Sequence, residues 1–316
     1  MKIFYIIFGE NLGNHIEAYL SMTSFRRQLG EGDEVCVVTT HPEYYNNIDV
    51  TVIPISNEQI SEWESPHHYF WRVKIKAVEY MHQRYPNDHI IYLDTDTFLF
   101  GDLNVLRSRL NEGKSFMHLR EGGPETYTGN GRKMWNMAKG KTFAGITLSE
   151  SHAMWNAGVI GLPASKLEVV TKTALTICDG ILDLMGSTHV IEQYSFSVAL
   201  QEHTDMTEAQ HFIAHYWGNK PEWEQWMNNL IVKAYMTKTS VDDVLMQMPL
   251  EELCRVAPVY VRTPSTQKRL VKLVQKLFPQ ANHRYTTPAT PATPPPTPPK
   301  GGEKRPHPLT PPKGGE

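Results

Sequence analysis

The chain has 316 residues, of which 40% are apolar and 21% charged, and its formal net charge is −3. This composition predicts a globular body with a sizeable core, and no apolar run approaches the ~20 residues of a membrane span. The slight acidic excess argues against nucleic acid as a partner, because nucleic-acid proteins usually carry a basic excess.

The first 110 residues alternate strand and helix patterns. Strands are predicted over 2–8, 35–39, 50–55 and 90–93, and helices over 15–29 and 66–85. The run at 2–8 is short and lacks a small-residue cleavage site, so it is interpreted as a first strand and not as a signal peptide. Short strands separated by helices predict an α/β fold with a mainly parallel sheet, whose ligands bind beyond the carboxyl ends of the strands.

The pattern becomes irregular over residues 121–145, which are rich in glycine. Two interpretations stay open here: a mobile lid that closes Trp135 and Met137 over a ligand, or a disordered insert. A buried strand is predicted over 156–162, helices over 167–184 and 190–200, and a short strand or loop over 212–217. The remainder to Gln280 is predicted to be mostly helical.

The composition divides the chain into a core at 1–225, a helical extension of the same domain at 226–284, and a tail at 285–316. The tail holds 11 of the 22 prolines and repeats the segment 297–303 word for word at 310–316. It is predicted to be disordered, either as a solvated tail or as a ligand for a proline-binding groove of an unknown partner. The amphipathic segment 264–278 is either a terminal helix packed on the body or a peripheral contact with an anionic inner membrane.

The three cysteines, Cys36, Cys178 and Cys254, are odd in number and widely spaced. This argues against a disulfide framework and against a cysteine zinc site, and it favours a reducing cytoplasm.

The strongest local signal is the pair Asp94 and Asp96, which follows directly on the apolar strand 90–93. Both carboxylates can turn toward one point at the sheet edge, where they suit Mg²⁺ or Mn²⁺ holding a diphosphate. The alternative is a pair of turn-forming aspartates that cap the next segment.

Two further motifs follow along the chain. Asn156-Ala157-Gly158 opens a buried strand with small residues, where a ligand can approach closely, although tight packing would need the same residues. The sequence His215-Tyr216-Trp217-Gly218-Asn219-Lys220-Pro221 supplies an imidazole able to complete a metal site and an ammonium group able to reach a phosphate.

In this order the motifs resemble those of the nucleotide-sugar glycosyltransferases of the GT-A fold, and they are most similar to family eight, the glycogenin and bacterial lipopolysaccharide galactosyltransferase-like group. That family shows a strand into Asp-x-Asp, then Phe-Asn-Ala-Gly, then Asp-Gln opening a helix, then His-Phe/Tyr-x-Gly-x-x-Lys-Pro-Trp. The counterparts here are Asp94/Asp96, Asn156-Ala157-Gly158, Glu192-Gln193 and the segment from His215 to Pro221. The resemblance spans about residues 1–225. The chain departs from the pattern in a shorter Gly-to-Lys gap, in Glu192 for Asp, and in Trp223 two places beyond Pro221.

The resemblance implies a set of roles. Asp94, Asp96 and His215 would bind the metal, normally Mn²⁺, with Mg²⁺ as the other candidate. Donor binding would fall to Asp94, Arg72, Lys76, Lys220 and Gly218, and the catalytic candidates near the donor sugar would be Glu192, Gln193 and Asn156. The loop 9–14 would cradle the nucleotide. Arg72 falls where the family often carries an arginine, and Lys76 lies four residues later on the same helical face, which is otherwise a solvated basic face.

The activity that the resemblance implies is metal-dependent transfer of a hexose from a nucleotide-diphosphate sugar to a hydroxyl group of a glycan or glycolipid. The setting would be the synthesis of bacterial-type surface polysaccharide or glycolipid, in the cytoplasm or on the cytoplasmic face of the membrane. Retention of configuration is favoured, since the family retains it and no separate motif supplies the carboxylate base that inversion needs. Two alternatives stay open: a haloacid-dehalogenase-type phosphatase, and a non-catalytic binding module with a transferase-like fold.

Overall fold

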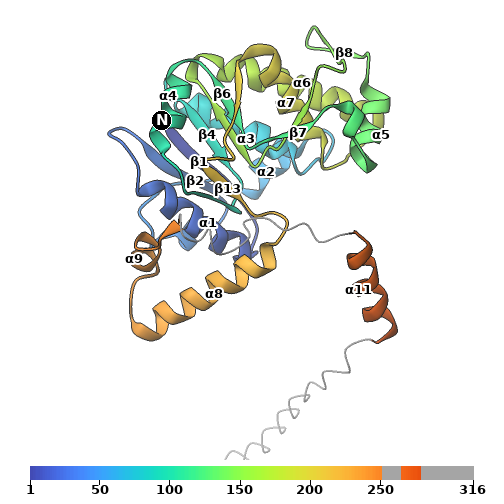
Figure 1. The fold of residues 1–316 in the computed structure, drawn as a ribbon. Helices are drawn as coiled ribbons and strands as arrows, with labels where there is room; N and C mark the ends of the chain where they lie inside the picture. The colour runs from blue at the N-terminus through green and yellow to red at the C-terminus, as the bar shows by residue number, and fades with distance from the viewer. Residues whose placement is uncertain (251–264, 279–316) are drawn as a thin grey trace, which may run out of the picture. The chain divides into compact units, whose positions relative to one another are not determined.

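The computed structural model describes residues 1–250 and 265–278. Within residues 1–250 the main sheet has seven strands in the order β12-β6-β11-β4-β1-β2-β3 (Figure 1). The strands of this sheet are β1 (Lys2–Ile7), β2 (Glu34–Thr39), β3 (Thr51–Pro54), β4 (Ile90–Leu93), β6 (Ser115–Met117), β11 (Val159–Leu162) and β12 (Met206–Glu208). Strands β3, β2, β1 and β4 are mutually parallel, and β11 runs antiparallel to both β4 and β6. The predicted α/β fold with a mixed, mainly parallel sheet is confirmed.

Alternate side chains of β1 enter two different cores, as the period of a strand requires. Ile3, Tyr5 and Ile7 pack with α1 (Leu12–Arg26) and α4 (Leu103–Asn111) on one face of the sheet. Phe4 packs on the other face with α3 (Arg72–Arg84), α6 (Leu167–Met185) and α7 (Ile191–His203). Because both faces of the sheet are covered, its strands are apolar almost throughout. This continuous apolar pattern is why they could be predicted from the sequence.

Two helices start at other residues than predicted. Helix α1 begins at Leu12, earlier than predicted, because the side chain of Asn11 accepts a hydrogen bond from the Gly13 N–H. The predicted helix 66–85 is shorter in the structure, since α3 starts only at Arg72. The remaining short elements in this part are η1 (Pro42–Tyr45), α2 (Asn57–Glu64), η3 (Ala164–Lys166) and β10 (Met154–Trp155).

The glycine-rich segment 121–145 has regular structure, contrary to the irregular segment that its composition predicts. It contains β7 (Arg120–Gly122), η2 (Pro124–Thr126), α5 (Gly129–Ala138) and β8 (Thr142–Phe143), and β8 pairs with β9 (Ile146–Thr147). Trp135 is 4% exposed and belongs to the core beneath α6, while Met137 is 45% exposed. Trp135 therefore has a packing role in this structure, and the lid stays a prediction.

Helices α8 (Lys220–Thr237) and α9 (Val241–Met246) pack against α1. A third core joins them to β5 (Thr97–Leu99), with Phe98, Tyr216 and Trp223 in aromatic contact. Trp223, which stands two places beyond Pro221, is therefore part of this core.

The chain divides into two units, Met1–Thr263 and Pro264–Glu316. In the second unit α11 (Ser265–Leu277) exposes apolar side chains, among them Leu270, Leu273 and Leu277, and its contact with a membrane stays a prediction. The predicted tail 285–316 and Cys254 lie outside the described residues. Among the residues that are described, no helix is both long and apolar enough to cross a bilayer.

Candidate metal and donor site

Two antiparallel pairings bring the motif residues together at the carboxyl end of β4. Strand β11 pairs with β4 so that Val159 lies opposite Leu93, and the Asp94 N–H donates to the Gly158 carbonyl at 2.8 Å. On the other side, β13 (Ile213–His215) pairs with β5 (Thr97–Leu99) so that His215 lies opposite Thr97. The sheet edge thus gathers segments that are more than 50 residues apart in the sequence.

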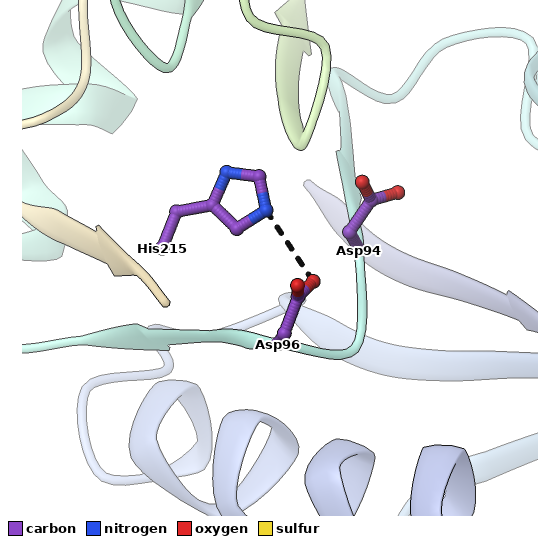
Figure 2. Close-up of side chains that lie close together, drawn as sticks. All are labelled: Asp94, Asp96 and His215. Carbon is purple, nitrogen blue, oxygen red and sulfur yellow. Dashed lines mark ion pairs between the residues drawn. The ribbon is translucent and has the colours of Figure 1, made fainter. Parts of the chain in front are cut away.

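Asp94, Asp96 and His215 form a compact cluster of possible metal ligands (Figure 2). One ligand atom from each lies within 4.8 Å of the other two, and His215 Nε2 is 3.3 Å from Asp96 Oδ1. Asp96 and His215 are buried, whereas the Asp94 side chain is 32% exposed. Two carboxylates and an imidazole form a donor set that fits Mn²⁺ or Mg²⁺.

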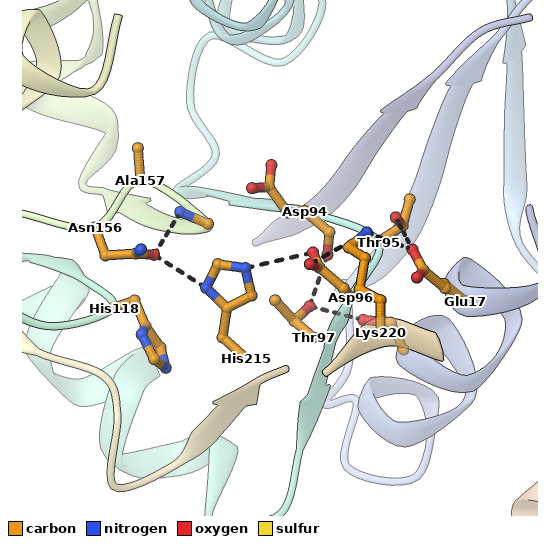
Figure 3. Close-up of polar contacts among 12 residues, drawn as sticks. Glu17, Asp94, Thr95, Asp96, Thr97, His118, Asn156, Ala157, His215 and Lys220 are labelled. Carbon is orange, nitrogen blue, oxygen red and sulfur yellow. Dashed lines mark hydrogen bonds and ion pairs between the residues drawn. The ribbon is translucent and has the colours of Figure 1, made fainter. Parts of the chain in front are cut away.

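A second cation-binding arrangement lies beside this cluster (Figure 3). Lys220 Nζ bridges Glu17 Oε2 at 2.9 Å and Asp96 Oδ2 at 3.2 Å, and Glu17 also accepts from the Thr95 hydroxyl at 2.7 Å. Burial alone would raise the pKa of Asp96, but His215 and Lys220 hold it well below its usual range. Asp96 is therefore ionised at neutral pH and able to bind a cation.

Lys74 links Asp94 to the start of α7. Its ammonium group is 3.2 Å from Asp94 Oδ1 and 3.5 Å from Glu192 Oε1, and it donates to the Ala157 carbonyl at 3.2 Å. Burial would lower the pKa of Lys74, but the two carboxylates raise it. Burial raises the pKa of Glu192 to about 7, against the lowering effect of Lys74.

A cavity of about 330 Å³ opens over these groups. Its charged side is formed by Lys74, Asp94, Asp96 and Lys220, and Phe70 and Trp71 line another part. Phe70 is 52% exposed and Trp71 39% exposed. A pocket that combines convergent charges with apolar walls is typical of sites for small organic anions.

The three predicted catalytic residues also lie at this edge. Asn156 donates through Nδ2 to Glu121 Oε1 at 3.0 Å, and Gln193 donates through Nε2 to Glu121 Oε2 at 2.9 Å. Glu192 lies next to Gln193 at the start of α7 and faces Lys74. The exposed carboxylate of Glu121 thus joins two of the candidate residues.

Two predicted donor-binding residues are not brought to this site. Arg72 makes a two-pronged ion pair with Asp179 of α6, at 2.7 and 3.0 Å, and donates to the Trp63 carbonyl. Lys76 pairs with Glu79 one turn further along α3. Neither lines the cavity, because their positions face away from the sheet edge; Lys74 faces it instead. Gly218 lies in the turn between β13 and α8.

Three residues of the site were not predicted from the sequence: Lys74, Glu17 and Glu121. Lys74 had a usable signal, since it stands three, four and seven residues before Ala77, Val78 and Met81, on the buried stripe of α3. A lysine on a buried stripe needs a partner, and the partners here are carboxylates. Glu17 gave a similar signal, as a fully buried glutamate among the apolar residues of α1.

Comparison with known proteins gives no sequence relative: no family model and no curated protein matches the chain. Solved structures that are similar in fold include the galactosyltransferase LgtC with donor and acceptor sugar analogues, at 13% identity and a TM-score of 0.41 over 66% of this chain and 74% of that one. An active-site mutant of LgtC has 14% identity and a TM-score of 0.43 over 66% and 73% of the two chains. Mouse xyloside xylosyltransferase 1 in its apo form has 14% identity and a TM-score of 0.44 over 66% and 85%. All three are glycosyltransferases by name. The functional argument for this chain rests on the site itself.

Proposed function

We propose that the protein is a metal-dependent glycosyltransferase that moves a hexose from a nucleotide-diphosphate sugar to a hydroxyl group of a glycan or glycolipid. The observation that carries this proposal is the cluster of Asp94, Asp96 and His215, whose two aspartates line one cavity with Lys74 and Lys220. Carboxylates and an imidazole suit a divalent cation, and two ammonium groups beside them suit the phosphates that such a cation holds.

The residues of the chain would divide the work as follows. Asp94, Asp96 and His215 would hold the cation, which stabilises negative charge on the departing diphosphate. Lys220 would contact the diphosphate from its position beside Asp96, and Glu17 would keep its ammonium group there. Gln193 would lie near the donor sugar, with the buried Glu192 behind it against Lys74. The Phe70 and Trp71 side of the cavity would exclude water from the sugar.

Retention of configuration remains part of the proposal, supported by the motif resemblance. The structure adds one observation that favours inversion, because Glu121 is an exposed carboxylate beside Gln193 and an inverting reaction needs a carboxylate base. Proton NMR of the first transfer product decides between retention and inversion. The coupling constant of the anomeric proton shows whether the new bond has the configuration of the donor or the opposite one.

A thermal-shift screen of nucleoside diphosphates with and without Mn²⁺ tests the function. We expect a nucleoside diphosphate to raise the melting temperature only when Mn²⁺ is present, and Asp96→Ala to abolish this rise. The matched control is Asp205→Ala, which removes an exposed carboxylate at the amino end of β12. A rise that survives in EDTA or in Asp96→Ala would contradict the metal assignment.

A second assay separates the two alternative functions. Transfer or slow hydrolysis of a nucleotide sugar in Mn²⁺ supports the transferase, and release of phosphate from p-nitrophenyl phosphate would support the phosphatase. Binding of a nucleoside diphosphate without turnover of any nucleotide sugar would support the binding module.

A further inference from the structure

The side-chain amide of Asn156 is buried, whereas the motif resemblance implied a place beside a donor sugar. Asn156 is 7% exposed, and its side-chain oxygen faces His215 (Figure 3). Its backbone N–H donates to the Leu119 carbonyl at 2.9 Å, and its own carbonyl accepts from the His118 N–H at 3.2 Å. The residue is therefore held by its backbone as well as by its side chain.

The orientation of this amide is fixed by its partners. Asn156 Oδ1 accepts from the backbone N–H of Gly158 at 3.1 Å, and Nδ2 donates to Glu121 Oε1 at 3.0 Å. A backbone N–H only donates and an ionised carboxylate only accepts, so a flipped amide would set donor against donor at Gly158 and acceptor against acceptor at Glu121.

A fixed amide fixes the tautomer of His215. Asn156 Oδ1 is 3.0 Å from His215 Nδ1, and an amide oxygen only accepts, so Nδ1 carries the proton. In the neutral ring the lone pair is then on Nε2, which faces Asp96 Oδ1 at 3.3 Å. Two lone-pair atoms at this distance repel each other unless a proton or a metal ion lies between them, and a ligand atom of Asp94 lies within 4.8 Å of both.

The ring of His215 is held in a close-fitting position. A Cβ atom on Gly158 would lie 2.1 Å from His215 Cε1, so only glycine leaves room for the ring. The His118 ring packs edge-on against it, with 5.1 Å between the centroids and 87° between the planes. The Asn-Ala-Gly motif therefore supplies both the acceptor for His215 Nδ1 and the space for its ring.

We propose that Asn156 is a positioning residue that holds His215 in the Nδ1–H tautomer and so directs the Nε2 lone pair toward Asp94 and Asp96. The inference rests on the proposed metal site for its purpose, but the tautomer itself does not depend on the ion. Outer hydrogen-bond partners of this kind commonly set the orientation and affinity of a ligating histidine.

The test is a long-range ¹H–¹⁵N correlation spectrum of the full chain labelled with ¹⁵N-histidine, recorded without metal at a pH where the rings are neutral. The His215 signals are assigned by their loss in His215→Gln. We expect a protonated nitrogen at Nδ1 and an unprotonated one at Nε2. A wild-type spectrum with the proton on Nε2 overturns the proposal without any need for a variant.

Variants then test the role of Asn156. Asn156→Leu should allow the other tautomer and weaken Mn²⁺ binding, measured by EPR of free Mn²⁺, by roughly 10–100-fold. In the double variant Glu121→Gln with Asn156→Asp, the side chain at 121 becomes the donor and the one at 156 the acceptor of their hydrogen bond. His215 Nδ1 again has an acceptor, so this double variant should show the wild-type tautomer. An unchanged tautomer in Asn156→Leu would contradict the proposal.

The control is Gln201→Leu, which removes a half-buried side-chain amide that bonds to the backbone of Ala153 at 2.9 and 3.0 Å. It should leave the His215 spectrum and the Mn²⁺ affinity within about twofold of wild type. If wild type shows the expected tautomer but binds no Mn²⁺, the proposed function fails while the assignment of Asn156 stands, so the two failures are distinguishable.

Discussion

Replacing Glu192 with Gln should change how the stability of the protein depends on pH. The Glu192 side chain is 2% exposed at the start of α7, and its Oε1 is 3.5 Å from Lys74 Nζ. Burial raises its pKa from the usual 4.5 to about 7, even though Lys74 acts to lower it. Between pH 4.5 and about pH 7, the carboxyl group of Glu192 is therefore mostly protonated in the folded protein and mostly ionised in the unfolded chain.

The sign of the effect follows from this difference. The contribution of Glu192 to stability is fully present below about pH 4.5 and is lost as the pH rises through about 7. The two pKa values differ by about 2.5, and one pKa unit corresponds to ~1.36 kcal/mol, so the full contribution is ~3 kcal/mol.

Urea unfolding at several pH values between 5 and 8, in EDTA, measures this effect as the difference between wild type and Glu192→Gln. The subtraction is needed because burial lowers the pKa of His118 to about 3, and a buried neutral histidine changes stability in the opposite direction. The difference should fall by about 2–3 kcal/mol over this range. Glu31→Gln removes an exposed carboxyl group and gives the scale of a surface change. A difference that does not vary with pH would refute the reasoning.

Three further predictions concern the fold and the site. Lys74→Met should weaken Mn²⁺-dependent binding of a nucleoside diphosphate at least ~10-fold, whereas Arg72→Met should leave it unchanged and lower the free energy of unfolding by roughly 1–3 kcal/mol, as titration calorimetry and urea unfolding would show. Trp135→Ala should cost about 3–5 kcal/mol of stability by urea unfolding without changing the diphosphate affinity, and a selective loss of affinity would support the lid hypothesis. Gly161→Ala should cost about 1–3 kcal/mol, because its Cβ would lie 2.2 Å from Cζ of Phe116; a melting temperature equal to wild type would contradict this.

The strands were predictable because their burial is continuous. Strand β4 has the predicted bounds, since four buried residues precede the first aspartate of the Asp-x-Asp pair. The predicted strand 156–162 is shorter in the structure, where β11 begins at Val159, because Asn156 bonds to Leu119 and His215. Residues with chemical roles thus depart from the regular pattern at the point where the strand meets the site.

The choice between Arg72 and Lys74 was not predictable from spacing between charges. Two residues apart on a helix, their side chains point about 200° apart, so the rotation of α3 about its axis decides which one reaches the sheet edge. That rotation is set by Val73, Ala77 and Met81, which are all buried. Phe70 fits the same apolar spacing in the sequence, but it precedes the helix and is exposed. The prediction of which face of α3 is buried was inaccurate because it included Phe70.

The charges of the site explain why a divalent cation and a diphosphate should bind together. Three carboxylates, Glu17, Asp94 and Asp96, face two ammonium groups, Lys74 and Lys220, which leaves an excess of negative charge before any contribution from Glu192. A diphosphate alone would meet this excess at short range, where the surroundings screen it poorly. A divalent cation reverses the balance, and the anion can then be held by the cation and by both lysines. The dependence of diphosphate affinity on Mn²⁺ should therefore be far stronger than one metal–phosphate contact would give.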